Sequence, residues 1–169
     1  MQYLRAKRPD IVDEITRIGD FEIDTIIGSN KKGAISTAVD RSSKLVKISI
    51  PTTKKADEVE GEIRRILLPF KDKIETITSD NRFEFSNHKS IANSLDCDYY
   101  FCHPYSLWER GLNEYTNGLI RQYISKGTSF ENITADYIQE IEDKLNNRPR
   151  KSLNWRTPNE VFYGKKEAA

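Results

Sequence analysis

Hydrophobic and polar residues follow a short period in the first third of the chain. β-Branched and aromatic residues fill three runs, 19–28 (GDFEIDTIIG), 33–40 and 44–50, and turn-forming sequences separate them. Connections this short favour antiparallel pairing, because parallel neighbours need a long crossover. The chain is therefore expected to open its sheet with three consecutive antiparallel strands.

Helical spacing then alternates with two more strands. Apolar residues recur at helical intervals over 54–68, and Pro69 stops that helix. A fourth strand is predicted over 73–80, a short helix over 87–95 and a fifth strand around 97–102. This β-β-β-α-β-α-β order indicates an α/β fold. Three more helices are predicted over 108–124, 134–146 and 157–164.

The helix at 108–124 has two different sides. One side is apolar, and we interpret its Trp108 and Tyr115 as core residues rather than as platforms for stacking bases. The other side is polar and is the one expected to carry chemistry. The apolar side holds Trp108, Leu112, Tyr115, Leu119 and Tyr123, and the polar side holds Arg110, Glu114, Asn117, Gly118 and Arg121.

Composition sets the broad class. With 37% hydrophobic and 31% charged residues, the 169-residue chain is expected to be globular. No apolar run approaches the roughly 20 residues that cross a bilayer, and the N-terminus lacks the apolar stretch of a signal peptide. We expect an intracellular protein with an N-terminal arm or linker (1–18), a core domain (19–164) and a short tail (165–169).

Charge is informative only locally. The net charge is +1, yet residues 144–156 carry five basic residues and no acid. Such a patch can neutralise phosphates, or it can be a solvated loop, and charge alone leaves both interpretations open. The five are Lys144, Arg148, Arg150, Lys151 and Arg156.

Two cysteines do not make a disulfide framework. Cys97 and Cys102 lie in or beside an apolar run, CDYYFC, and are interpreted as reduced core thiols. A zinc site that combines them with His88 and His103 is the alternative. Its spacing matches no paired ligand pattern.

Three acids stand where strand ends and a helix can bring them together. Asp24 lies inside an apolar strand, Asp80 ends the fourth strand, and Glu114 projects from the polar side of the helix. Three converging carboxylates suit hard divalent cations, and two such ions assist phosphoryl transfer. The alternatives are a buried hydrogen-bonded acid, an Asx turn and a solvated helix residue. Asp20, Glu22 and Glu84 are rivals for the same roles.

Six segments in order resemble one known family. From about residue 17 to 163, the chain is similar to the catalytic domain of bacterial insertion-sequence transposases of the insertion-sequence-thirty family, with 33 residues between Asp80 and Glu114. This is the integrase-core type, with a ribonuclease H-like fold. The segments are GDFEIDTIIG, KGAISTAVDRSSKL, DNRFEFSNHKSIA, HPYSLWERGLNEYTNGLIRQY, LNNRPRK and TPNEVF.

The resemblance implies a fold, an activity and partners. It implies a mixed five-stranded sheet flanked by helices, with an Asp-Asp-Glu metal triad at Asp24, Asp80 and Glu114. Two Mg²⁺ or Mn²⁺ ions would assist hydrolysis of a phosphodiester at the element's end, and the freed 3′-hydroxyl would then attack target DNA. The expected partners are DNA and a second copy of the chain, with no membrane and no small-molecule substrate. The expected location is the bacterial cytoplasm, at the nucleoid.

Helix geometry adds candidate DNA contacts to this resemblance. Asn117 and Arg121 lie one and two turns beyond Glu114 on the same face and are candidates for positioning a DNA end. Arg110 lies one turn before Glu114, where it would contact DNA or pair with that acid. Arg148, Arg150 and Lys151 are candidates for contacts with the DNA backbone.

Two departures from the family pattern bear on activity. The family usually has Gly after Asp-Asn, whereas this chain has Arg82, which resists positive φ and close backbone approach. Arg82 would either add a phosphate contact or distort the turn at Asp80 and weaken metal binding. The second departure is that the chain begins just before the catalytic domain. The family's N-terminal helix-turn-helix region is missing, so recognition of element ends is not expected of this chain alone.

Two other functions stay open at this stage. A catalytically silent DNA-binding or assembly module of a degenerate element would account for Arg82. A cellular nuclease for RNA–DNA hybrids shares the fold, but the LNNRPRK and TPNEVF segments favour the transposases.

Overall fold

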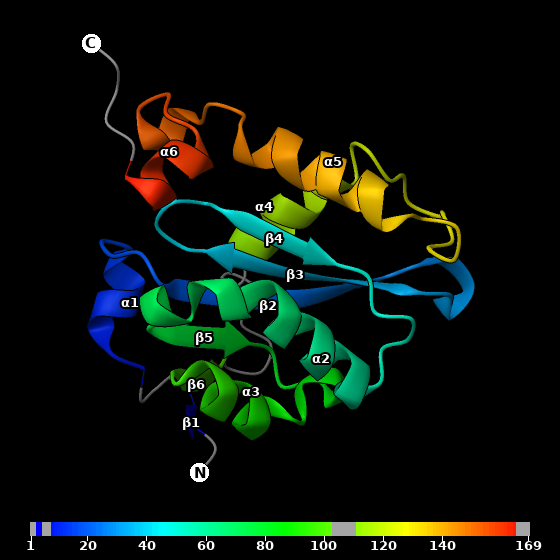
Figure 1. Cartoon of the computed structure of the whole chain (residues 1–169), viewed down its shortest axis with the longest axis horizontal. Coiled ribbons are helices and arrows are strands. Elements are labelled where there is room, and N and C mark those ends of the chain that lie inside the picture. The colour runs from blue at the N-terminus through cyan, green and yellow to red at the C-terminus, as the bar shows by residue number, and fades with distance from the viewer. Residues whose placement is uncertain (1–2, 5–7, 103–110, 165–169) are drawn as a thin grey trace.

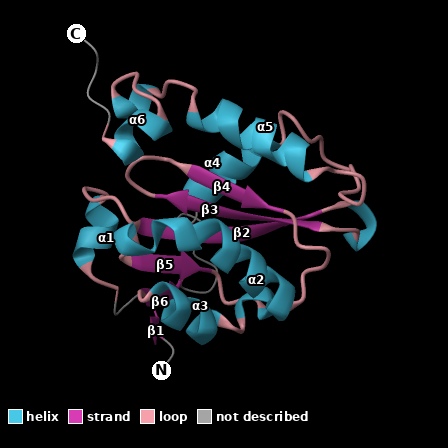
Figure 2. Ribbon diagram, viewed as in Figure 1, coloured by secondary structure: helices cyan, strands magenta, loops and turns pink. Residues whose placement is uncertain are grey.

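A mixed six-stranded sheet forms the centre of the molecule, with helices packed on it (Figures 1 and 2). This computed structural model describes residues 3–4, 8–102 and 111–164. The spatial strand order is β1-β6-β5-β2-β3-β4. The strands are β1 (Tyr3–Leu4), β2 (Asp20–Ile27), β3 (Ala34–Asp40), β4 (Val46–Ser49), β5 (Thr76–Ser79) and β6 (Asp98–Phe101). The helices are α1 (Asp10–Glu14), α2 (Ala56–Leu67), α3 (His88–Leu95), α4 (Gly111–Ile120), α5 (Ala135–Asn146) and α6 (Pro158–Tyr163).

The predicted β-β-β-α-β-α-β order is confirmed from β2 to β6. Strands β2, β3 and β4 pair antiparallel, as their short connections require. Strand β5 pairs parallel to β2, and β6 pairs parallel to β5, each after a helical crossover. The five predicted strands and five predicted helices therefore lie where the hydrophobic pattern placed them, with bounds shifted by a few residues.

The segment expected to be an arm, residues 1–18, contains two elements of its own. Strand β1 adds to the edge of β6 in parallel, and helix α1 follows it. Val12 of α1 is fully buried, and Arg8 is only 6% exposed. The sequence offered no periodicity in this stretch, because one buried residue in a five-residue helix leaves no repeating signal.

Two apolar clusters cover the two faces of the sheet. On one face, Phe21 and Ile23 of β2 pack with residues of α2, α3 and α6. On the other, Ile26 of β2 and residues of β3 and β4 pack with α4 and α5. Neighbouring residues of a strand point to opposite faces, so β2 contributes to both clusters. It lies inside the sheet, between β5 and β3.

Helix α4 presents a different side to the sheet from the one predicted. Tyr115, interpreted above as a core residue, is 58% exposed, whereas Asn113 and Thr116 are buried. The first turns of α4 contact β2 near Asp24, where the sheet surface is polar, so polar residues face it. Leu119 and Ile120 enter the core only further along the helix. Trp108, Arg110 and His103 lie outside the described residues.

Side chains of α5 form hydrogen bonds with backbone groups at the outer edge of the sheet. Strand β4 is an edge strand, and the Asn146 amide bonds the backbone of Val46 twice. Asn146 Oδ1 accepts from the Val46 N–H at 2.9 Å, and Asn146 Nδ2 donates to the Val46 carbonyl at 2.7 Å. Glu142 Oε2 accepts from the Ile48 N–H at 2.8 Å. These bonds close an edge that would otherwise expose unpaired backbone groups.

None of the helices in the described ranges is both long enough and apolar enough to cross a membrane.

Candidate active site

A row of polar side chains lies on one face of the two central parallel strands. Asp20, Glu22 and Asp24 alternate along β2 and therefore point to the same side. Thr76 and Thr78 of β5 lie beside the first two, since the register pairs Asp20 with Thr76 and Glu22 with Thr78. Thr76 Oγ1 donates to Asp20 Oδ1 at 2.7 Å across the strands.

The same register brings Asp24 beside Asp80. Continuing the parallel pairing by two residues matches Asp24 with Asp80, which directly follows β5. Neighbouring strands lie about 4.8 Å apart, so the two backbones are close at this point. Asp24 is 4% exposed, and the Asp80 side chain is 14% exposed. If the register continues in this way, two of the three predicted ligands lie at matching positions on neighbouring strands.

A hydrogen bond ties helix α4 to this position. Asn117 Nδ2 donates to Asp24 Oδ2 at 2.9 Å and so holds the carboxylate on the side of α4. Glu114 lies one turn before Asn117, a rise of about 4.5 Å along the helix axis. The predicted proximity of Asn117 to the carboxylates is thus present in the structure.

Glu114 is not gathered into one cluster with the two aspartates. Its side chain is exposed, and the part of the chain that the structure describes holds no group of three acidic, histidine or cysteine side chains arranged to bind one ion. Glu114 therefore lies one helical turn from Asn117, the residue that bonds Asp24.

Arg82 occupies a defined place beside Asp80. Its Nε lies 3.0 Å from Asp80 Oδ2, and its backbone N–H donates to Asp80 Oδ1 at 3.3 Å. Its φ is −83°, an ordinary value for any L-residue, so the backbone at Arg82 shows no sign of the distortion that was one of the two alternatives. Arg82 affects this carboxylate through its positive charge and leaves the backbone unstrained.

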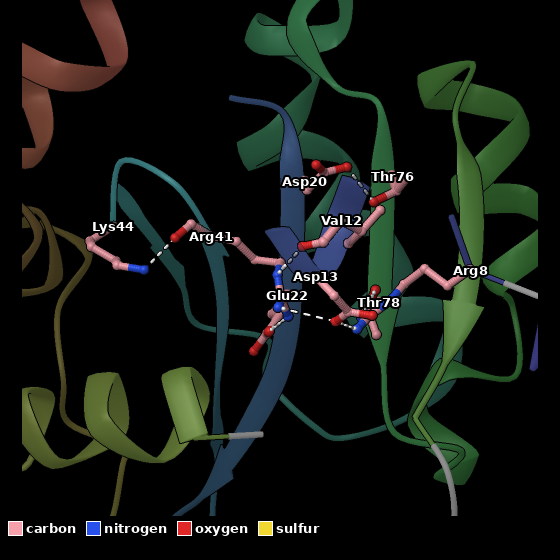
Figure 3. A network of polar contacts seen from close by, with 9 residues as sticks. All are labelled: Arg8, Val12, Asp13, Asp20, Glu22, Arg41, Lys44, Thr76 and Thr78. Carbon is pink, nitrogen blue, oxygen red and sulfur yellow. Dashed lines mark hydrogen bonds and ion pairs between the residues drawn. The ribbon is translucent and has the colours of Figure 1, made fainter. Parts of the chain in front are cut away.

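The rival acids Asp20 and Glu22 bond other side chains, and Figure 3 shows Asp20 with Thr76 and Glu22 with Arg41. Asp20 accepts from Arg17 Nε and Nη2, both at 2.9 Å, and Glu22 forms an ion pair with Arg41. Burial raises the pKa of Glu22, and the charges of Arg41 and Arg8 oppose that rise. The third rival, Glu84, is 7% exposed and lies 3.9 Å from Arg82 Nη1. These contacts leave Asp24 as the acid of β2 nearest to Asp80.

Two arginines whose contacts with the sheet the sequence did not predict, Arg8 and Arg41, complete this network (Figure 3). Arg8 Nη1 donates to Thr78 Oγ1 at 3.1 Å, and Arg8 also pairs with Asp13. Arg41 Nε donates to the Val12 carbonyl at 3.0 Å. Together they join helix α1 to the polar face of the sheet. Sequence alone gave no signal for this, because the partners are up to 70 residues apart.

The predicted DNA contacts have different surroundings. Arg121 lies over the Phe130 ring at 5.3 Å and donates to the carbonyls of Ser125 and Ile27, and burial lowers its pKa. Arg150 is 9% exposed, and its Nη2 donates to the Leu145 carbonyl at 3.0 Å. Arg148 and Lys151 are exposed. Arg121 and Arg150 therefore also have structural roles, whereas Arg148 and Lys151 project into solvent.

Cys97 and Cys102 do not form a disulfide with each other, as predicted, and His103 of the alternative zinc site lies outside the described residues. Cys97 is half-buried and Cys102 is buried. Burial raises the pKa of the Cys97 thiol to about 12, which keeps it protonated at neutral pH. The His88 ring packs against the rings of Tyr99 and Phe101 at 5.6 and 4.8 Å.

The fold is that of a ribonuclease H-like integrase core. The catalytic core domain of BIV integrase superposes with a TM-score of 0.63 at 18% sequence identity, covering 86% of this chain and 93% of that chain. No family model matches the sequence.

Sequence comparison identifies the relatives. The chain is 53% identical over 156 residues to the transposase for insertion sequence element IS4351 of Bacteroides fragilis, which is 92% of this chain and 48% of that protein. It is 35% identical over 152 residues to transposase InsI for insertion sequence element IS30A of Escherichia coli (strain K12), 89% of this chain and 39% of that protein. The resemblance inferred from the motifs is confirmed: the chain is a homologue of insertion-sequence transposases, those of the insertion-sequence-thirty type included. It spans less than half the length of each of these two.

Proposed function

We propose that this chain is the catalytic core of a DNA transposase, cleaving a phosphodiester at an element end and joining the freed 3′-hydroxyl to target DNA. The observation that carries this proposal is the parallel register of β2 and β5, whose continuation beyond Glu22 and Thr78 would bring Asp24 beside Asp80. The homology to insertion-sequence transposases supports the same chemistry. The substrate class would be DNA, two copies of the chain would join two element ends, and the site of action would be the bacterial cytoplasm, at the nucleoid.

The donor set suits a divalent cation. Asp24, Asp80 and Glu114 offer only carboxylate oxygens, the ligands that Mg²⁺ and Mn²⁺ take in proteins. Two ions held there would supply activation of the attacking oxygen and stabilisation of the leaving oxygen. These residues would hold the ions, and Asn117 would keep Asp24 oriented toward α4. Asn117, Arg121, Arg148 and Lys151 remain candidates for positioning the DNA strand.

A nicking and joining assay tests this function. The chain is incubated with supercoiled plasmid and a labelled duplex end in Mg²⁺, in Mn²⁺ or with a chelator. We expect nicking that requires the divalent ion. Glu114→Gln should lower the nicking rate more than about 100-fold, because it removes a metal ligand and keeps the shape of the side chain. Glu131→Gln, at an exposed acid after α4, is the matched control. Chelator-resistant nicking, or full activity of Glu114→Gln, would contradict the proposal.

Arg82 is expected to weaken metal binding by competing for Asp80. Its guanidinium must leave Asp80 Oδ2, 3.0 Å away, before a cation takes that oxygen. Because Arg82 is half exposed, the pair contributes at most about 1 kcal/mol. Arg82→Ala should therefore tighten Mn²⁺ binding by about two- to fivefold in calorimetry. Arg64→Ala, on the exposed side of α2, should leave the affinity unchanged. Weaker binding by Arg82→Ala would show that Arg82 supports the site.

A further inference from the structure

A groove of about 740 Å³ lies beside the candidate active site, on the Tyr115 side of helix α4. Its walls come from Lys44 and the start of β4, from α4, and from the end of α5 with the segment that follows it. Tyr115 directly follows Glu114 in α4, so the groove borders the surface from which Glu114 projects. The lining residues are Lys44, Val46, Gly111, Leu112, Tyr115, Thr116, Leu119, Leu145, Arg148, Pro149, Arg150, Lys151 and Ser152.

The charged side chains that line this groove are all basic. Its lining includes Lys44, Arg148, Arg150 and Lys151 and no acidic residue. Arg150 is 9% exposed, its Nε has no hydrogen-bond acceptor, and no carboxylate of the described residues pairs with it. A nearly buried guanidinium without a carboxylate is costly. This cost favours an anionic ligand.

Lys44 adds a second partly desolvated cation. It is half-buried, and its ammonium donates to the Arg41 carbonyl. Burial and the nearby positive charge of Arg41 lower its pKa. An anion seated in the groove would stabilise the charged form of Lys44 and of Arg150 together.

The other walls suit a flat, partly apolar group. Val46, Leu119 and Leu145 form an apolar surface, and Tyr115 exposes 58% of its area at the rim. Hydroxyl groups of Thr116 and Ser152 complete the lining. Cations for phosphate beside an aromatic ring for a base are the combination that binds single-stranded nucleic acid. An acidic peptide would use the cations and leave the exposed ring without a stacking partner.

We propose that this groove binds unpaired nucleotides of a DNA strand, with a base on Tyr115 and phosphates on Arg148, Lys151 and the buried Arg150. The bases of a duplex are stacked on each other and cannot reach a protein ring, so the ligand is a frayed or single-stranded segment. The inference rests on the proposed function only in taking DNA as the partner. A strand seated here would continue along α4 past Glu114 toward Asp24.

Fluorescence anisotropy in chelator, without divalent ions, tests the groove apart from catalysis. The probes are a labelled short oligothymidylate and a labelled blunt duplex. Tyr115→Ala should weaken binding of the single strand about tenfold, as expected for the loss of one stacked base. Tyr115→Phe should keep the affinity. Tyr163→Ala, at another exposed tyrosine that lies outside the groove, is the control and should also bind like the parent. Circular dichroism checks that each variant is folded.

Three further arms make the outcome decisive. Lys151→Ala should lower the slope of log affinity against log salt by about one, and Lys126→Ala should not. Asp24→Asn should bind the single strand normally, so a failure of the proposed chemistry would not be mistaken for a failure of the groove. Unchanged affinity of Tyr115→Ala for the single strand would overturn the proposal. So would an equal loss on both probes, or displacement of the oligothymidylate by hexaglutamate but not by thymidine monophosphate.

Discussion

Asp24→Asn is expected to abolish nicking and joining while leaving the fold intact. The substitution removes the charge of Asp24, which the continued β2–β5 register would place beside Asp80. The new amide still offers an oxygen to Asn117 Nδ2, so the tether to α4 can persist. Loss of a group that only supports a metal ligand costs about 10–100-fold, and loss of a ligand itself should exceed about 100-fold.

The measurements are rates of metal-dependent nicking, Mn²⁺ affinity by calorimetry and the thermal midpoint. Asp136→Asn, an exposed aspartate in the first turn of α5, is the matched control. We expect the control to match the parent in all three. An Asp24→Asn variant that nicks at the parent's rate would remove Asp24 from the catalytic set. A large fall in its thermal midpoint would instead assign Asp24 a structural role.

Asn146→Leu is expected to have the largest effect on stability outside the apolar core. Leu has a similar volume but cannot bond the Val46 N–H and carbonyl, which Asn146 now satisfies at 2.9 and 2.7 Å. Each buried backbone group left without a partner costs about 1–3 kcal/mol. The free energy of unfolding should therefore fall by about 2–4 kcal/mol.

Urea unfolding measures this change. Asn93→Leu, at an exposed position of α3, is the control and should shift the free energy of unfolding by less than about 0.5 kcal/mol. If Asn146→Leu shifts it no more than the control does, water replaces the amide at the β4 edge and α5 is not what closes the sheet. The same variant should aggregate more readily, since its edge strand is left open.

The effect at Asn146 also gives a physical role to the LNNRPRK segment. Its two functions divide along the chain: Asn146 closes the β4 edge, and Arg148, Arg150 and Lys151 line the basic groove. The sequence predicted a basic cluster here but not the role of Asn146. Its amide bonds a strand 100 residues away, and such a contact leaves no local pattern in the sequence.

Local spacing predicted the elements well. The β-branched runs and short turns placed β2, β3 and β4, and helical periodicity placed α2, α3 and α5. The prediction from local spacing failed at helix α4, beside the candidate site. At α4 the prediction assumed an apolar surface beneath the helix, whereas the sheet there is polar around Asp24. Tyr115 is therefore exposed to solvent, and Asn113 and Thr116 are buried against the sheet.

What the sequence by itself determined is the order of the elements and the identity of the candidate carboxylates. Strand and helix periods follow from neighbouring residues, and ordered motifs carry the resemblance to the transposases. Only the tertiary structure decided which acids meet. The parallel β2–β5 register, continued beyond Thr78, would bring Asp24 beside Asp80, and Asp20 and Glu22 pair instead with Arg17 and Arg41. Strand register and ion pairing join residues tens of positions apart, and the local spacing of residues along the sequence does not predict such contacts.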